Sequence, residues 1–261
     1  MTTWAWERPE TDPGHAEEGG TYLFDRDEMH ADEPVIPRLC SVALLGDSTV
    51  ACRYFPPANR PENHLLVRLR RAFPEQRFVI QNLASAEAET GFRLGQMDQI
   101  FAAIPEMHLA FVRFNIQETD AAGFQEQMGS LQSCCAAMRE QYPGITLILE
   151  TGIWIHHPAH FFEEIHGRLG PMYNALRAWA VETGYPVVDI YQKMQAEAGK
   201  GNWDLRVRGL PTPEQTVVDD SFDAFFGDEP AFFANTHPNS RCLALIAEWE
   251  VAMLKLLAKK G

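Results

Sequence analysis

The sequence has no long hydrophobic run and no excess of basic residues. None of its 261 residues belongs to a stretch approaching the ~20 apolar residues that a membrane span needs. Its first seven residues lack the basic start and apolar core of a signal peptide, which leaves the compartment open, with the cytoplasm as the default expectation. The formal net charge is −14, and a surface of that sign repels nucleic acids and anionic membranes.

Cysteines are also few, and none is spaced in a C-x-x-C pattern. An odd number of cysteines without such spacing fits a reduced protein with packed thiols better than a disulfide framework. The five cysteines are Cys40, Cys52, Cys134, Cys135 and Cys242.

Two regions differ in pattern. Residues 1–38 are rich in proline, glycine and acidic residues without a sustained period, which predicts an extended leader. Residues 39–261 alternate between strand and helix patterns and are expected to form one domain. The predicted strands are 42–45, 78–80, 109–114, 146–149 and 186–190, and the predicted helices are 64–73, 92–104, 124–141, 169–182 and a last one from about Pro238. This alternation predicts an α/β fold: a five-stranded parallel sheet, doubly wound in three layers.

The tetrapeptide Gly46-Asp47-Ser48-Thr49 directly follows the first predicted strand. An apolar run that ends in Gly-Asp-Ser is typical of a buried strand that delivers a serine to the edge of a sheet. Far downstream, His237 lies in a polar turn before the last helix. A serine hydroxyl becomes a good nucleophile when a base removes its proton, and histidine does so near neutral pH. The pattern therefore predicts Ser48 as nucleophile and His237 as base, with Asp47 as a turn residue.

With these residues in place, Leu45-Gly46-Asp47-Ser48-Thr49 resembles the first block of the SGNH (GDSL-type) hydrolases, particularly the branch that acts on acetylated carbohydrates. The order of strands and helices over roughly residues 40–258 is similar as well. The resemblance implies a flavodoxin-like fold and hydrolysis of a small acyl ester without a cofactor. It also implies three oxyanion donors: the amide of Ser48, a backbone amide after the second strand and a side-chain amide after the third.

The chain departs from the family pattern after the second and third strands. Asn82 matches the residue that opens the second block, but Ala88 stands where the family has glycine, with Ala86 as the other candidate position. Alanine keeps the N–H group and loses the conformational freedom of glycine. In the third block, Gln117 stands in place of asparagine and is the expected oxyanion donor. Asn115, in place of glycine, is a less direct substitute and a candidate for substrate binding.

The largest departure is Ala234, three residues before His237, where the family places an aspartate. Alanine lacks the carboxylate that normally orients the imidazole. Three accounts are open. In the first, a carboxylate of the preceding loop takes the place of the missing aspartate. In the second, the position was changed to trap an inactive enzyme. In the third, the chain is a degenerate member of the family that binds without turnover. The candidate replacement acids are Asp223, Asp228 and Glu229.

The segment after the fourth strand is rich in histidine, and its spacing matches no established zinc pattern, so we expect a substrate-contacting loop and no metal. The residues concerned are His156, His157, His160, Glu163, Glu164 and His166. Trp154 is a candidate for stacking on a sugar, with packing of the loop as an equally open role.

Two charged residues of the predicted strands have structural interpretations. Arg113 lies on a buried strand and is expected to pair with a carboxylate, with an acidic substrate as the alternative partner. Asp189, at the end of the fifth strand, is expected to cap the following turn.

The predicted function is that of a serine esterase that removes a small acyl group, preferably acetyl, from a carbohydrate or related ester. The expected partner is that ester rather than a nucleic acid or a membrane, and the oligomeric state is open. The alternative is a catalytically impaired or non-catalytic carbohydrate-binding protein on the same fold, as the departures at Ala234, Asn115 and Gln117 indicate.

Overall fold

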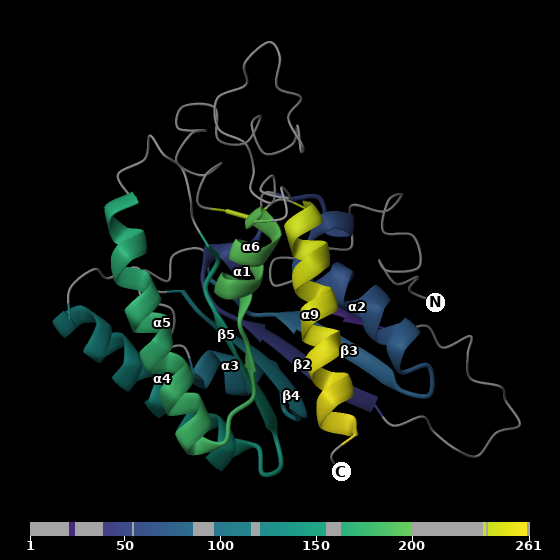
Figure 1. The fold of residues 1–261 in the computed structure, drawn as a ribbon. Helices are drawn as coiled ribbons and strands as arrows, with labels where there is room; N and C mark the ends of the chain where they lie inside the picture. The colour runs from purple at the N-terminus through teal and green to yellow at the C-terminus, as the bar shows by residue number, and fades with distance from the viewer. Residues whose placement is uncertain are drawn as a thin grey trace, which may run out of the picture.

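The computed structural model describes residues 21–23, 39–53, 55–85, 97–115, 121–154, 163–199, 237–238 and 240–259. Over these ranges helices cover both faces of a six-stranded sheet (Figure 1). The strands are β1 (Thr21–Leu23), β2 (Leu39–Leu45), β3 (Arg77–Asn82), β4 (Leu109–Phe114), β5 (Thr146–Thr151) and β6 (Val187–Val188). The helices are α1 (Ser48–Ala51), η3 (Pro57–Asn59), α2 (Pro61–Ala72), α3 (Met97–Ala103), α4 (Ala121–Gln141), α5 (Glu163–Thr183), α6 (Ile190–Gly199) and α9 (Ser240–Ala258).

The predicted α/β fold with a five-stranded parallel sheet is confirmed. The sheet order is β1-β3-β2-β4-β5-β6, and every pair from β3 to β6 is parallel. Counted along the chain, the parallel strands therefore stand in the order 2-1-3-4-5, which is the flavodoxin-like arrangement. In this arrangement the connection after β2 and the connection after β4 run to opposite sides of the sheet, and ligands of such folds bind at the carboxyl ends of these two strands.

β1 is an addition to the prediction. It pairs antiparallel with the edge strand β3 and lies inside the segment predicted as a leader. Three residues are too few to show a period in the sequence, so this strand has no local signal. The predicted boundary between leader and domain at residue 38 stays a prediction, because the structure describes only the three residues of β1 within residues 1–38.

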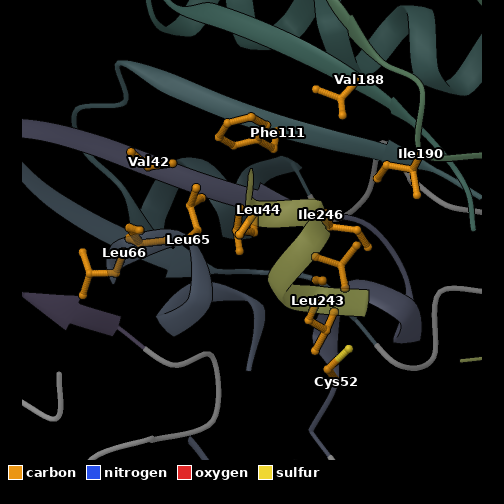
Figure 2. Close-up of a cluster of buried hydrophobic side chains, with 14 of the residues drawn as sticks. Val42, Leu44, Cys52, Leu65, Leu66, Phe111, Val188, Ile190, Leu243 and Ile246 are labelled. Carbon is orange, nitrogen blue, oxygen red and sulfur yellow. The ribbon is translucent and has the colours of Figure 1, made fainter. Parts of the chain in front are cut away.

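Two apolar clusters fix the layers, because successive side chains of β2 point to opposite faces of the sheet. Val42 and Leu44 pack with α2 and α9, which run side by side over one face (Figure 1), and Figure 2 shows this cluster. Ala43 and Leu45 pack toward α3, α4 and α5 on the other face. No helix within the described ranges is long and apolar enough to cross a membrane.

Element boundaries differ from the prediction mainly at helix starts. The fifth predicted strand is shorter because Asp189 ends it and caps α6, accepting a hydrogen bond from Gln192 N at 3.1 Å. The predicted capping role of Asp189 is thereby confirmed, whereas α6 itself was not predicted. The last helix begins at Ser240 rather than at Pro238.

Candidate active site

The turn between β2 and α1 places Ser48 at the carboxyl end of β2, one of the two central strands of the sheet. Gly46 allows this turn because a Cβ there would lie 2.7 Å from Val50 Cγ2 and 3.3 Å from Arg113 Cβ. Asp47 is the N-cap of α1, and its Oδ1 accepts hydrogen bonds from Thr49 N at 2.9 Å and Thr49 Oγ1 at 2.7 Å. Asp47 is thus the turn residue that the sequence predicted.

Ser48 and His237 meet across 189 residues of sequence. His237 Nε2 lies 3.0 Å from Ser48 Oγ, within hydrogen-bond distance. His237 is buried, and Ser48 is half-buried at the first position of α1. A neutral imidazole whose Nε2 faces a serine hydroxyl is placed to accept its proton. The arrangement therefore has the geometry of a nucleophile and its general base.

Asn115 follows β4 and reaches the same turn. Its Nδ2 donates to Asp47 Oδ2 at 2.7 Å, and its Oδ1 lies 3.5 Å from the hydroxyl of Tyr173, which comes from α5. A Cβ on Gly152 would overlap both the side-chain Oδ1 of Asn115 and the Tyr173 hydroxyl, so glycine is required there. In the structure the Asn115 amide therefore supports the N-cap of α1, and a role in substrate binding stays a prediction.

Asn82, at the end of β3, supports α1 from the other side. Its Nδ2 donates to Val50 O at 2.9 Å and to Glu62 Oε2 at 2.7 Å, while its Oδ1 accepts from Ala84 N at 3.2 Å. Glu62 comes from α2 and is buried. That burial raises the pKa of Glu62 to about 7, against a smaller lowering by the Asn82 hydrogen bond.

This shifted carboxyl predicts a pH-dependent stability. Because the pKa of Glu62 is raised on folding, the protonated form favours the folded state, and its stabilising effect is lost as pH rises from about 4.5 to about 7. The free energy of unfolding should fall by about 2 kcal/mol more in this chain than in Glu62→Gln between about pH 5 and pH 8. Urea unfolding of both proteins at the two pH values measures the difference. Equal pH slopes would show that Glu62 titrates normally.

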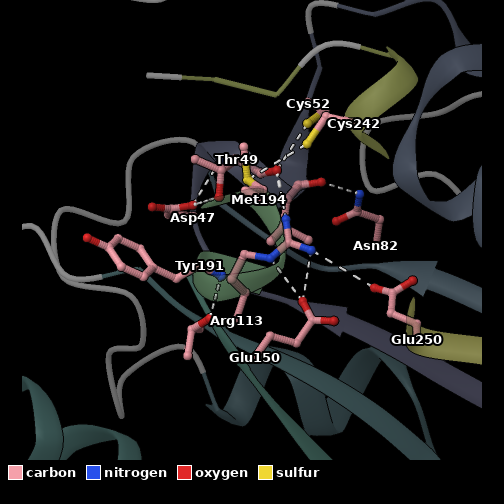
Figure 3. Close-up of polar contacts among 12 residues, drawn as sticks. Asp47, Thr49, Cys52, Asn82, Arg113, Glu150, Tyr191, Met194, Cys242 and Glu250 are labelled. Atoms are coloured by element: carbon pink, nitrogen blue, oxygen red, sulfur yellow. Dashed lines mark hydrogen bonds and ion pairs between the residues drawn. The ribbon is translucent and has the colours of Figure 1, made fainter. Parts of the chain in front are cut away.

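Arg113 is part of the buried floor beneath α1. It is 1% exposed and forms an ion pair with Glu150, with 2.8 Å between Nη2 and Oε2. The predicted pairing with a carboxylate is therefore confirmed, and burial leaves no room for the alternative of an acidic substrate at this side chain. Figure 3 shows this network.

Trp154 packs against both apolar clusters and is half-buried. Its backbone N–H points to Met194 Sδ at 3.4 Å, which ties the end of β5 to α6. These contacts give Trp154 the packing role, and stacking on a sugar stays a prediction.

Several predicted site residues lie outside the described residues: Ala86, Ala88, Gln117, Ala234, Asp223, Asp228, Glu229, His156, His157 and His160. The backbone of Glu163, Glu164 and His166 is described as part of α5, without their side chains. Among the side chains that are described, no three histidine, cysteine or acidic residues gather in a way that would hold a metal ion.

The sequence reasoning missed Glu62, Tyr173, Glu150 and Glu250, which all contact the turn or its supports. Of these four residues, Glu250 could have been identified from the sequence pattern. Glu250 stands four residues after Ile246 in α9, on the side that faces the core. A charged residue on the apolar face of a helix marks a buried polar partner.

Neither a comparison with protein-family models nor one with curated proteins gives a match. Solved structures do match. The acetyl xylan esterase AlAXEase is similar with a TM-score of 0.59 at 13% identity, over 81% of this chain and 98% of that chain. A member of the lipolytic protein G-D-S-L family from Veillonella parvula gives 0.56 at 12% identity, over 82% and 97%. A two-domain esterase active on acetylated mannans gives 0.54 at 15% identity, over 85% of this chain and 51% of that one.

At these identities the similarity concerns the fold. It covers more than four fifths of the chain in each comparison. The chain therefore has the fold of the SGNH (GDSL-type) hydrolases.

Proposed function

We propose that the protein is a serine ester hydrolase that removes a small acyl group, preferably acetyl, from a carbohydrate. The observation that carries this proposal is the 3.0 Å contact between Ser48 Oγ and His237 Nε2 at the carboxyl end of β2. The fold adds support, because similar structures include an acetyl xylan esterase and an esterase active on acetylated mannans.

In the proposed mechanism, His237 Nε2 takes the hydroxyl proton while Ser48 Oγ attacks the ester carbonyl. The tetrahedral intermediate collapses with loss of the alcohol, which receives the proton from His237, and leaves an acyl group on Ser48. His237 then deprotonates a water molecule that attacks the acyl group, and Ser48 leaves as a free hydroxyl. No cofactor enters these steps.

The oxyanion requires N–H donors aimed at the carbonyl oxygen. The N–H of Ser48 is one of the first of α1, and such groups have no partner inside their own helix. We assign it as one donor, with the backbone N–H of Ala88 and the side-chain amide of Gln117 as the other two.

The substrate proposal rests on net charge and on the side chains near Ser48. A surface of net charge −14 disfavours anionic polymers, whereas an acetylated sugar is neutral. Trp154, in the segment after β5, is the proposed aromatic contact for the sugar ring, and Asn115 is the proposed polar contact.

A panel of substrates tests this function. We expect the rate of hydrolysis to be highest for p-nitrophenyl acetate and to be at least about tenfold lower for the butyrate or longer-chain esters. The protein should also release acetate from acetylated xylan or mannan oligosaccharides. Ser48→Ala is the blank for each substrate. If the unmodified chain hydrolyses none of these esters faster than Ser48→Ala does, the esterase function is rejected. The non-catalytic alternative, which the alanine at position 234 motivates, is then favoured.

A further inference from the structure

The helix that begins with Ser48 is too short to be stable by itself. α1 has four residues, and a helix of one turn does not recover the entropy of fixing its backbone. Its last carbonyl groups also lack helical partners, because no further turn follows. The position of Ser48 therefore depends on groups outside α1.

Buried side chains from the two strands beside β2 supply these groups. Thr49 O accepts a hydrogen bond from Arg113 Nη1 at 3.1 Å, and Val50 O accepts one from Asn82 Nδ2 at 2.9 Å. Arg113 belongs to β4 and Asn82 to β3, so the turn is held from both sides of β2.

Arg113 is itself fixed from behind by two carboxyl groups (Figure 3). Its Nε and Nη2 both donate to Glu150 Oε2, at 2.9 and 2.8 Å. Glu250 Oε1, from α9, lies 4.0 Å from Nη2. The guanidinium thus links the Glu150 carboxylate on β5 to the backbone carbonyl of Thr49, the residue after Ser48.

The charges of this network balance. Burial raises the pKa of Glu250 well above its ordinary value, and the neighbouring Glu150 carboxylate raises it further. The neutral form of Glu250 is therefore favoured. A side-chain hydrogen bond with Glu150 contributes to this shift in pKa, and Glu150 Oε1 is buried without a hydrogen-bond donor among the described N–H and O–H groups. One cation, one anion and one neutral acid form a buried unit with no net charge.

Stability alone does not account for such a unit. Buried ion pairs are often replaceable by apolar residues at little or no cost in stability. A fork of N–H groups that joins a carboxylate to a backbone carbonyl instead fixes a position. A displacement of a reacting group by 1 Å lowers a rate by about 10²-fold.

We propose that Arg113 is a positioning residue that holds the nucleophile turn through the carbonyl of Thr49, with Glu150 and Glu250 fixing its guanidinium. This inference rests on the proposed role of Ser48 as nucleophile. Arg113 does not touch the substrate; it acts on the reaction through α1.

The test removes both members of the Arg113–Glu150 ion pair, so that neither charge stays buried without its partner. The variant is Arg113→Met with Glu150→Met. The matched control is Arg177→Met with Asp189→Asn, which removes another Arg–carboxylate pair, 2.6 Å between Nε and Oδ2, that does not contact α1. Amide hydrogen exchange of the peptide that contains α1 is measured by mass spectrometry, together with kcat, KM and the rate of Ser48 labelling by a fluorophosphonate.

We expect exchange of the α1 peptide to become at least about tenfold faster in the Arg113/Glu150 variant. The kcat and the labelling rate should fall about 10- to 100-fold with KM changed less than about threefold, and the control should keep all four values. Exchange and labelling like those of the unmodified chain, or equal changes in the control, would overturn the proposal. If the unmodified chain has no Ser48-dependent activity, the proposed function fails, and hydrogen exchange still decides whether Arg113 holds the turn.

Discussion

A carboxylate introduced by Ala234→Asp is expected to raise kcat for p-nitrophenyl acetate by up to about 10⁴-fold. Removing the acid from a serine–histidine–acid triad costs about that factor, because the imidazole loses its correct tautomer and the imidazolium loses its counter-charge. In this chain, Nε2 of His237 faces Ser48 Oγ at 3.0 Å, and a triad acid acts on the imidazole through its other nitrogen, Nδ1. The gain should appear in kcat rather than in KM, since the acid does not touch the substrate.

Ala234→Asn is the matched control, because it adds a side chain of the same size without the charge. It should give no more than a small part of the gain. If Ala234→Asp and Ala234→Asn both leave kcat within about threefold of the unmodified chain, another carboxylate already orients His237, and a search among Asp223, Asp228 and Glu229 follows.

The loss caused by Ser48→Ala should depend strongly on position 234. The effects of substituting catalytic residues that act as a unit are not additive. Without the acid, the serine supplies only a small part of the rate acceleration that it gives in a complete triad. We expect Ser48→Ala to lower kcat by about 10²-fold in the unmodified chain and by about 10⁶-fold in the Ala234→Asp background.

Initial rates of p-nitrophenyl acetate hydrolysis for the four proteins of this cycle give the coupling between Ser48 and position 234. Urea unfolding of each protein serves as control for folding. Additive effects of the two substitutions would show that the new carboxylate acts without His237 and Ser48, against the proposed mechanism.

The sequence predicted those parts of the molecule that depend on local patterns. The apolar run before Gly46 and the alternation of strand and helix patterns along the chain were sufficient for the parallel sheet and its layers. The placement of Ser48 at the carboxyl end of the first parallel strand followed from the same pattern.

The supports of the site were harder to predict, because they depend on pairs that are distant in sequence. Arg113 and Glu150 are 37 residues apart, and Glu62 reaches Asn82 from a neighbouring helix. No local period connects such residues; only the register of neighbouring strands brings Arg113 beside Glu150. Similarly, Asn115 was considered for the substrate, and the structure shows its amide bound to Asp47.

The most direct test of the account is whether an acyl group forms on Ser48. The chain and Ser48→Ala are mixed with p-nitrophenyl acetate and quenched in acid, and their peptides are analysed by mass spectrometry. The account predicts one acetyl group on the peptide that contains Ser48, and none on that peptide in Ser48→Ala or, at the same mixing time, in His237→Gln. Release of p-nitrophenol with the acetyl group on another residue, or an unmodified Ser48 throughout the reaction, would contradict it.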